Sequence, residues 1–345
     1  MTERLDSQGM WEATAGLPEQ AEAAARDACG LHGLPEREAV ENVVVLGMGG
    51  SGIAGDILLA TAGPFMSVPV VVVKSYTLPA FVGEGSLVFA ISFSGDTEET
   101  VEAATEAALQ GARVVAVTGG GELAKLATGW QVPMVPVPAD IPQPRAGIGA
   151  MAIPPLMVLE QVGLFPGAAR WVQLAVEQLK ARRDQLTGPA SPAAELARRI
   201  GRTIPLIHSS GALGAAAAQR WKTQVNENAK SPAFYAVQPE LCHNEVAGWG
   251  QHGDVTRQVV TLVKLRHDQE HPQVSRRFDM VDDVVREVVA SIEEVQAEGD
   301  GELAQLLDLV LVGDFLSLHL AFNEGIDPGP VPTLTELKRL LADAS

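Results

Sequence analysis

The chain has 345 residues, enough for two ordinary domains with a sizeable apolar core. Apolar residues make up 46% and aromatic residues 5%, a composition that is typical of folded α/β proteins and excludes a disordered chain. With 25 basic and 43 acidic residues the net charge is −18, so we expect neither nucleic acid nor an anionic membrane as a partner, whereas a small anion remains compatible with this charge.

Residues 1–40 are predicted to form an Ala- and Glu-rich helical segment without evident chemistry. The first 20 residues contain acidic side chains and lack an apolar core, so they do not form a secretory signal. Apolar runs such as 68–73 are too short to span a bilayer, and Cys29 and Cys242 cannot build a disulfide framework. We therefore expect a cytoplasmic protein with no membrane partner.

Strands and helices alternate through residues 41–165, which we expect to form a first subdomain. The predicted order is strand, glycine turn and helix (42–63), strand (68–76), strand, Ser/Gly turn and helix (86–112), and strand and helix (113–127). Continuous runs of Val, Ile and Leu in the strands indicate a parallel sheet that is covered on both faces. A Pro-rich crossing (131–150) and a helix near 151–162 complete this subdomain.

Residues 166–328 are expected to form a second, related subdomain. A long polar helix from Arg170 leads to a strand, a Ser/Gly turn and a helix within 201–230, which loosely repeats the unit that begins at Asn42. The fold class predicted is therefore α/β, with two tandem three-layer α/β/α subdomains and parallel sheets. The tail, 329–345, is predicted to be a C-terminal helix with Thr333 as its N-cap.

The first candidate ligand site is the glycine–serine turn, residues 47–52 (GMGGSG), between a predicted strand and a helix. Backbone amides and the helix dipole at such a turn attract anions. The spacing differs from the dinucleotide fingerprint G-x-G-x-x-G, and the next strand ends in Lys and Ser without an acidic residue for a ribose. A tight turn that needs no ligand is the alternative.

The second candidate is the serine–threonine turn, residues 92–97 (SFSGDT), where Ser92, Ser94 and Thr97 follow another strand. Three hydroxyl groups and helix N-terminal amides suit a terminal phosphate, although Thr97 or Asp96 could simply cap the helix. Two such turns at strand carboxyl ends of one sheet indicate a ligand crevice.

The third candidate is the segment 226–249, which is Pro-punctuated and which we predict to be too irregular for a strand or a single helix. It contains Glu227, Lys230 and His243, whose acid/base chemistry suggests an active site, although each charge taken alone is typical of a solvated surface. Arg145, between Pro and Gly, could reach a substrate oxygen or form a structural ion pair.

One metal motif is rejected. The run 267–271 (HDQEH) matches the pattern H-x-x-E-H of zinc peptidases, but a strand is predicted before it, Pro272 follows it and no third ligand is evident. We expect a solvated turn here, and no metal site in the chain.

Together these motifs resemble the SIS (sugar isomerase) domain family, and more narrowly the bifunctional phosphoglucose/phosphomannose isomerases. The resemblance covers about residues 40–341 and is carried by GMGGSG-x-x-GD, SxSGxTxET and RWKTQxNENAK-xPAFxxxxPELxHNE. It implies that the two turns hold the substrate phosphate through residues Gly49, Gly50, Ser51, Ser92, Ser94 and Thr97.

The same resemblance implies the catalytic residues. Glu227 would be the base, Arg145 would lie near the reacting carbons and Lys338 would act from the terminal helix, although Gly329 stands where the family commonly has a Thr. His243 would open the sugar ring in the neighbouring subunit's site, which implies a homodimer.

Isomerisation between an aldose and a ketose moves a proton between adjacent carbons, so it requires a base and no redox cofactor. We expect interconversion of glucose 6-phosphate or mannose 6-phosphate with fructose 6-phosphate through a cis-enediolate. Two alternatives are a phosphosugar-sensing protein without turnover and an aminosugar-phosphate isomerase.

Overall fold

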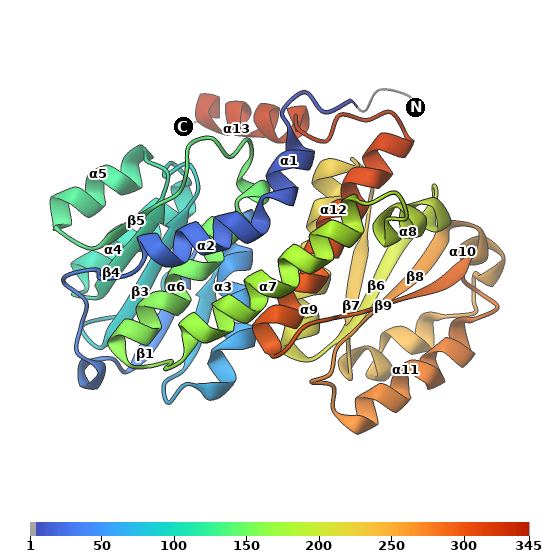
Figure 1. Ribbon diagram of the computed structural model, residues 1–345, viewed down its shortest axis with the longest axis horizontal. Coiled ribbons are helices and arrows are strands. Elements are labelled where there is room, and N and C mark those ends of the chain that lie inside the picture. The colour runs from blue at the N-terminus through green and yellow to red at the C-terminus, as the bar shows by residue number, and fades with distance from the viewer. Residues whose placement is uncertain (1–4, 345) are drawn as a thin grey trace.

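Two parallel sheets lie side by side in the computed structural model, which describes residues 5–344 (Figure 1). Sheet A has the order β2-β1-β3-β4-β5 and sheet B the order β7-β6-β8-β9, and all paired strands are parallel. The strands are β1 (Asn42–Leu46), β2 (Val70–Val73), β3 (Ser86–Ser92), β4 (Arg113–Thr118), β5 (Met134–Pro136), β6 (Ile204–Ser210), β7 (Phe234–Gln238), β8 (Val260–Arg266) and β9 (Ser291–Gln296).

The α-helices cover both faces of each sheet. They are α1 (Met10–Ala15), α2 (Leu17–Asp27), α3 (Gly49–Thr61), α4 (Glu98–Leu109), α5 (Gly121–Trp130), α6 (Ile148–Val162), α7 (Ala168–Thr187), α8 (Pro192–Ile200), α9 (Gly211–Asn228), α10 (Gly253–Val259), α11 (Pro272–Val285), α12 (Glu302–Asn323) and α13 (Pro332–Ala344). The predicted α/β fold with two parallel-sheet subdomains is thus confirmed. Residues 1–4 and 345, which belong to the predicted terminal segments, lie outside the described residues.

The alternation of apolar side chains along the strands builds the layers. In β1, Val43 and Val45 join the large central core, whereas Val44 and Leu46 join a smaller core under α4 and α5. Sheet B has a corresponding outer core beneath α11. The central core is shared by the two subdomains, since helices α3 and α6 of one and α9 and α12 of the other contribute to it.

Helix α12 lies at the centre of this core and packs on α7, α8 and α9 (Figure 1). By length and composition it could cross a membrane, as no other helix among residues 5–344 could, but 94% of its apolar window is buried inside the protein. The expectation that no apolar stretch is long enough to span a bilayer was therefore wrong. Its apolarity serves packing, because helices surround it.

Three local predictions differ from the structure. The segment 226–249 contains a regular edge strand, β7, and was wrongly predicted to be irregular. The polar strand β9 has no counterpart among the predicted strands, and the single polar helix from Arg170 is two helices, α7 and α8. Thr333 lies inside α13 and not at its N-cap, since the helix begins at Pro332.

Candidate active site

The glycine–serine turn and the serine–threonine turn lie next to each other at the carboxyl edge of sheet A. They follow β1 and β3, which are paired strands in the sheet. Helix α3 begins at Gly49, whose φ of +52° is left-handed, and α4 begins directly after Thr97. The N-termini of α3 and α4 therefore lie at the same edge of sheet A, on adjacent strands.

Within the glycine–serine turn, Gly50 packs closely against the segment that contains Pro144 and Arg145. A Cβ atom at Gly50 would lie 3.3 Å from the carbonyl oxygen of Pro144, so the turn packs directly against the residue before Arg145. The hydroxyl of Ser51 is buried and donates to Sδ of Met151 at 3.3 Å. The amides of the turn, rather than this hydroxyl, are thus the donors that remain for an anion.

The serine–threonine turn is organised by its own hydroxyl groups. Ser92 is fully buried, donates to the hydroxyl of Thr97 at 3.0 Å and accepts from the amide of Gly95 at 3.1 Å. Ser94 is exposed and its hydroxyl accepts from the amide of Asp96. Thr97 occupies the N-cap position of α4 but makes no capping bond, so the capping alternative does not account for its side chain.

Arg145 is the most enclosed charged group at this site, with only 3% of the residue exposed. Its Nε donates to Oδ1 of Asn228 at 2.6 Å, and Nη2 donates to the carbonyl oxygens of Pro328 and Gly329 at 2.6 and 2.7 Å. Burial lowers the pKa of the guanidinium from its ordinary value, while Glu227 acts in the opposite direction.

Glu227 lies beside Arg145 at the end of α9. Its Oε2 is 3.5 Å from Nη1 of Arg145, and 29% of its side chain is exposed. A carboxylate that is reachable from solvent and held by only one long ion pair retains lone pairs for a proton. The structure therefore brings Glu227 and Arg145 together beside Gly50 of the glycine–serine turn.

Lys230 extends this cluster and was not assigned a role from the sequence. Its Nζ donates to the carbonyl oxygens of Glu227 at 2.7 Å, Pro328 at 3.0 Å and Asp327 at 3.1 Å. Partial burial, with the nearby charge of Arg145, lowers the pKa of Lys230 to about 8. The sequence places Lys230 in the candidate segment 226–249, but not beside residues 327 and 328, which are distant in sequence.

His243 is not near Glu227 in this chain. Helix α9 begins at the carboxyl end of β6 and carries Glu227 in its last turn, whereas β7 runs parallel to β6, so that Gln238 pairs with Ser210. His243 follows Gln238 by five residues and is exposed. Its segment therefore follows the sheet edge at which α9 begins, whereas Glu227 lies at the other end of α9, roughly 24 Å along the helix from Gly211.

Lys338 lies on α13, which Figure 1 shows at the same end of the molecule as α1. The residue is exposed and has no hydrogen bond or ion pair with any described residue. The segment that leads into α13 is nevertheless fixed at the site through the carbonyl groups of Pro328 and Gly329. Gly329 packs closely on Gln8, since a Cβ atom there would lie 2.9 Å from its side chain.

The HDQEH run does not form a metal centre. Nε2 of His267 is 3.0 Å from the carbonyl oxygen of Ser210, whereas His271 caps α11 by accepting from the amide of Gln273. Over residues 5–344 no group of three or more potential His, Cys, Asp or Glu ligands is present.

The chain matches two family models. Residues 190–341 match the bacterial phospho-glucose isomerase C-terminal SIS domain, and residues 38–130 match the SIS domain. The chain is 32% identical to a bifunctional phosphoglucose/phosphomannose isomerase of Caldicellulosiruptor bescii, over 97% of this chain and 99% of that protein. It is 35% identical to the protein of the same name from Aquifex aeolicus, over 87% of this chain and 90% of that protein.

The fold is also found among solved structures. Tagatose-6-phosphate ketose/aldose isomerase from Escherichia coli superimposes with a TM-score of 0.68 at 13% identity, over 93% of this chain and 95% of that chain. This likeness shows the fold alone. The sequence relatives carry the family relationship.

Proposed function

Because the chain belongs to the bifunctional phosphoglucose/phosphomannose isomerases, we propose a mechanism for its aldose–ketose isomerisation of glucose 6-phosphate and mannose 6-phosphate to fructose 6-phosphate. In this mechanism Glu227 removes the C2 proton and returns it to C1, through a cis-enediolate. The single observation that carries the proposal is the pairing of Glu227 with the buried Arg145, next to the glycine–serine turn.

Arg145 is proposed to stabilise the enediolate oxygen. Its Nε and Nη2 make the short hydrogen bonds of 2.6 to 2.7 Å, whereas Nη1 makes the two long ones, 3.3 Å to Gln143 and 3.5 Å to Glu227. Nη1 is thus the nitrogen that exchanges a weak partner for a substrate oxygen at the least cost. A guanidinium fixed in this way needs little reorganisation as negative charge develops.

The substrate phosphate is proposed to bind between the two turns, through the amides of Gly49, Gly50 and Ser51 and the hydroxyls of Ser94 and Thr97. Ser92 is proposed to hold Thr97 in position, since its hydroxyl is buried and bonded to that of Thr97. Binding energy from the phosphate would then position the distant C1 and C2 atoms at Glu227. Lys338 is proposed to approach the sugar from α13.

His243 is proposed to act in the partner's site of a homodimer, where it exchanges protons during ring opening. Two observations support this proposal. His243 follows the sheet edge at which α9 begins, whereas Glu227 lies at the other end of α9, and Phe234 and Tyr235 are exposed on the edge strand β7. Leu241 is buried in the outer core of sheet B and so is not available for an interface. Residues of both proposed subdomains, 41–165 and 166–328, would then form the site. We also propose that the enzyme is cytoplasmic.

The test is a coupled assay for fructose 6-phosphate, with glucose 6-phosphate and with mannose 6-phosphate in turn. We expect turnover of both substrates, and the same rates in EDTA because the proposed roles belong to side chains. Binding of both sugars without turnover would favour a sensor. A loss in EDTA that zinc reverses would contradict the mechanism.

A further inference from the structure

Helices α9 and α12 pack on each other in the central apolar core, and four buried polar side chains lie at their contact. They are Arg220 and Asn228 on α9 and Asp314 and Ser317 on α12, and none is more than 3% exposed. We call these four residues the α9–α12 polar cluster. Apolar residues of similar volume often stabilise such a contact equally well or better, so stability alone does not account for the cluster.

Two members of the α9–α12 polar cluster bind Arg145. Asn228 accepts a hydrogen bond from Nε of Arg145 through Oδ1 at 2.6 Å. Arg220 donates from Nη2 to the backbone carbonyl oxygen of Arg145, and it is itself held by both carboxylate oxygens of Asp314, at 2.8 and 3.0 Å. The cluster therefore fixes the backbone and the Nε side of Arg145, and it leaves Nη1 with only its two long bonds.

The hydroxyl of Ser317 determines which way the amide of Asn228 points. This hydroxyl has one proton, which it donates to the carbonyl oxygen of Asp314 at 2.7 Å, so toward Asn228 it can only accept. It accepts from Nδ2 of Asn228 at 2.9 Å, and the amide oxygen then faces Nε of Arg145, which can only donate. A reversed amide would place its NH₂ group against the guanidinium. Both neighbours thus select the same orientation.

We propose that Asn228 and Ser317 are positioning residues for the isomerisation, an inference that rests on the proposed function of Arg145. Ser317 orients the amide of Asn228, and Asn228 holds the guanidinium through Nε, so that Nη1 is presented to the enediolate oxygen. Both side chains are fully buried, so they act through Arg145 and not on the sugar itself. A donor that is fixed before the reaction stabilises the developing negative charge without reorganisation.

Steady-state kinetics of the full chain with glucose 6-phosphate test the proposal. Asn228→Leu keeps the branched shape of the side chain but removes the acceptor for Nε of Arg145. We expect kcat to fall about 10-fold or more, with KM changed by less than about 3-fold because the phosphate still binds at the two turns. Ser317→Ala leaves the amide without its guide and should lower kcat by about 3-fold or more.

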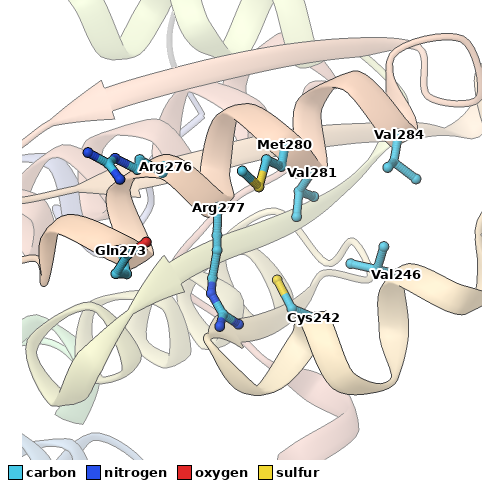
Figure 2. Close-up of a pocket in the computed structure, with 8 residues that line it drawn as sticks. All are labelled: Cys242, Val246, Gln273, Arg276, Arg277, Met280, Val281 and Val284. Carbon is cyan, nitrogen blue, oxygen red and sulfur yellow. The ribbon is translucent and has the colours of Figure 1, made fainter.

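Two control variants match these substitutions. Ser209→Ala also removes a fully buried serine hydroxyl, but this hydroxyl has no hydrogen-bond partner among the described residues. Gln273→Leu also removes an amide. Figure 2 shows Gln273 on α11, at a cavity whose lining includes no member of the α9–α12 polar cluster. Both controls should keep kcat within about 2-fold of the wild-type value.

A double-mutant cycle with Arg145→Lys separates positioning from a purely structural role. Lysine keeps the positive charge but lacks the Nε–H group that bonds to Asn228. If Asn228 acts through Arg145, Asn228→Leu should lower kcat by less than about 2-fold in the Arg145→Lys background. An equal loss of kcat in both backgrounds overturns the proposal.

Binding gives a second measurement that does not depend on turnover. The hydroxamate of 5-phospho-D-arabinonic acid has the planar shape and the oxygen pair of the enediolate, whereas fructose 6-phosphate does not. By calorimetric titration, Asn228→Leu should weaken binding of the hydroxamate by about 10-fold or more, and Ser317→Ala by about 3-fold, with the Kd of fructose 6-phosphate changed by less than about 2-fold. Equal weakening of the two ligands contradicts the positioning role.

The outcomes separate this inference from the proposed function. An inactive wild type contradicts the proposed function, and the inference with it. An active wild type whose kcat and hydroxamate binding are unchanged by Asn228→Leu and Ser317→Ala overturns the positioning roles alone. Melting curves show whether each variant is folded, and if Asn228→Leu does not fold, Ser317→Ala decides alone.

Discussion

At the residue scale, Glu227 offers the most direct test, because a base can be disabled without a change of shape. Glu227→Gln keeps the size of the side chain but removes its capacity to take a proton. We expect kcat to fall by about 10³-fold, with phosphate binding nearly unchanged, measured by the coupled assay and by titration of fructose 6-phosphate. Near-normal turnover of Glu227→Gln would show that Glu227 is not the base. Glu106→Gln on α4 is the control variant.

Lys230 predicts a pH dependence of stability. Its pKa is about 8 in the folded chain against 10.5 for an ordinary lysine, so the unfolded chain binds more protons between these values. The free energy of unfolding of the wild type should therefore rise between pH 8 and pH 10.5, relative to that of Lys230→Met. Urea unfolding at both pH values measures the difference, which we expect to be about 1 kcal/mol or less because water screens the group.

An unchanged difference between the two proteins across this range would show that Lys230 titrates normally. Lys230→Arg would then be informative, since a guanidinium stays charged throughout.

The residues of the site differ in how far sequence can predict them. The two turns are predictable because glycine or hydroxyl residues directly follow an apolar strand in each of them. A window of about ten residues of sequence contains all of these features. The contacts of Arg145 are not, since its partners Asn228 and Pro328 are 83 and 183 residues away. Lys230 has the same difficulty, because its effect arises from carbonyl groups that only the folded chain assembles.

At the element scale, the packing of α9 on α12 depends on a missing side chain. A Cβ atom at Gly313 would lie 2.3 Å from the indole ring of the fully buried Trp221, whose Nε1 also donates to the carbonyl oxygen of Leu309. Gly313→Ala should thus destabilise the protein by about 1–3 kcal/mol despite the better helix propensity of alanine, as measured by urea unfolding.

Gly129 in α5 provides the opposite case. It has no atom within 4 Å of the position that a Cβ would occupy. Gly129→Ala should raise the free energy of unfolding by about 0.5–1 kcal/mol. If both substitutions stabilise the protein, the packing of Trp221 on α12 is looser than described.

The elements that sequence reasoning missed share a physical cause. Both β7 and β9 are edge strands with largely exposed or half-buried side chains. Strand β9 (SIEEVQ) lacks the continuous apolar run of the central strands, and β7 (FYAVQ) has only a short one between polar and proline residues. Helix α12 shows the converse. Its uniform apolarity is plain in sequence, but only the arrangement of neighbouring helices shows that it is buried in a protein core.

At the scale of the whole molecule, the separation of His243 from Glu227 predicts complementation. Glu227→Gln and His243→Ala are each expected to be inactive as homodimers. In a mixed dimer one site collects both substitutions and the other neither, so activity should recover toward one wild-type site per heterodimer.

The measurement requires verified heterodimers, which are obtained by refolding two differently tagged chains together and isolating those that carry both tags. Inactive parents together with inactive heterodimers would mean that His243 serves its own chain, and a monomeric wild type would exclude sharing altogether.

Helix α1 near the start of the chain rests on α12 near its end, since the ring of Trp11 meets that of Phe315 at a centroid distance of 4.7 Å. During synthesis on the ribosome, therefore, α1 cannot pack on α12 until almost the whole chain has been made. At about 5–20 residues per second, the roughly 300 residues between the two aromatic rings take about 15–60 s to synthesise. Helix α6 already has α2 and α3 to pack on, whereas α3 lacks its later partners α9 and α12 for part of this time, and a truncated first subdomain would lack them permanently.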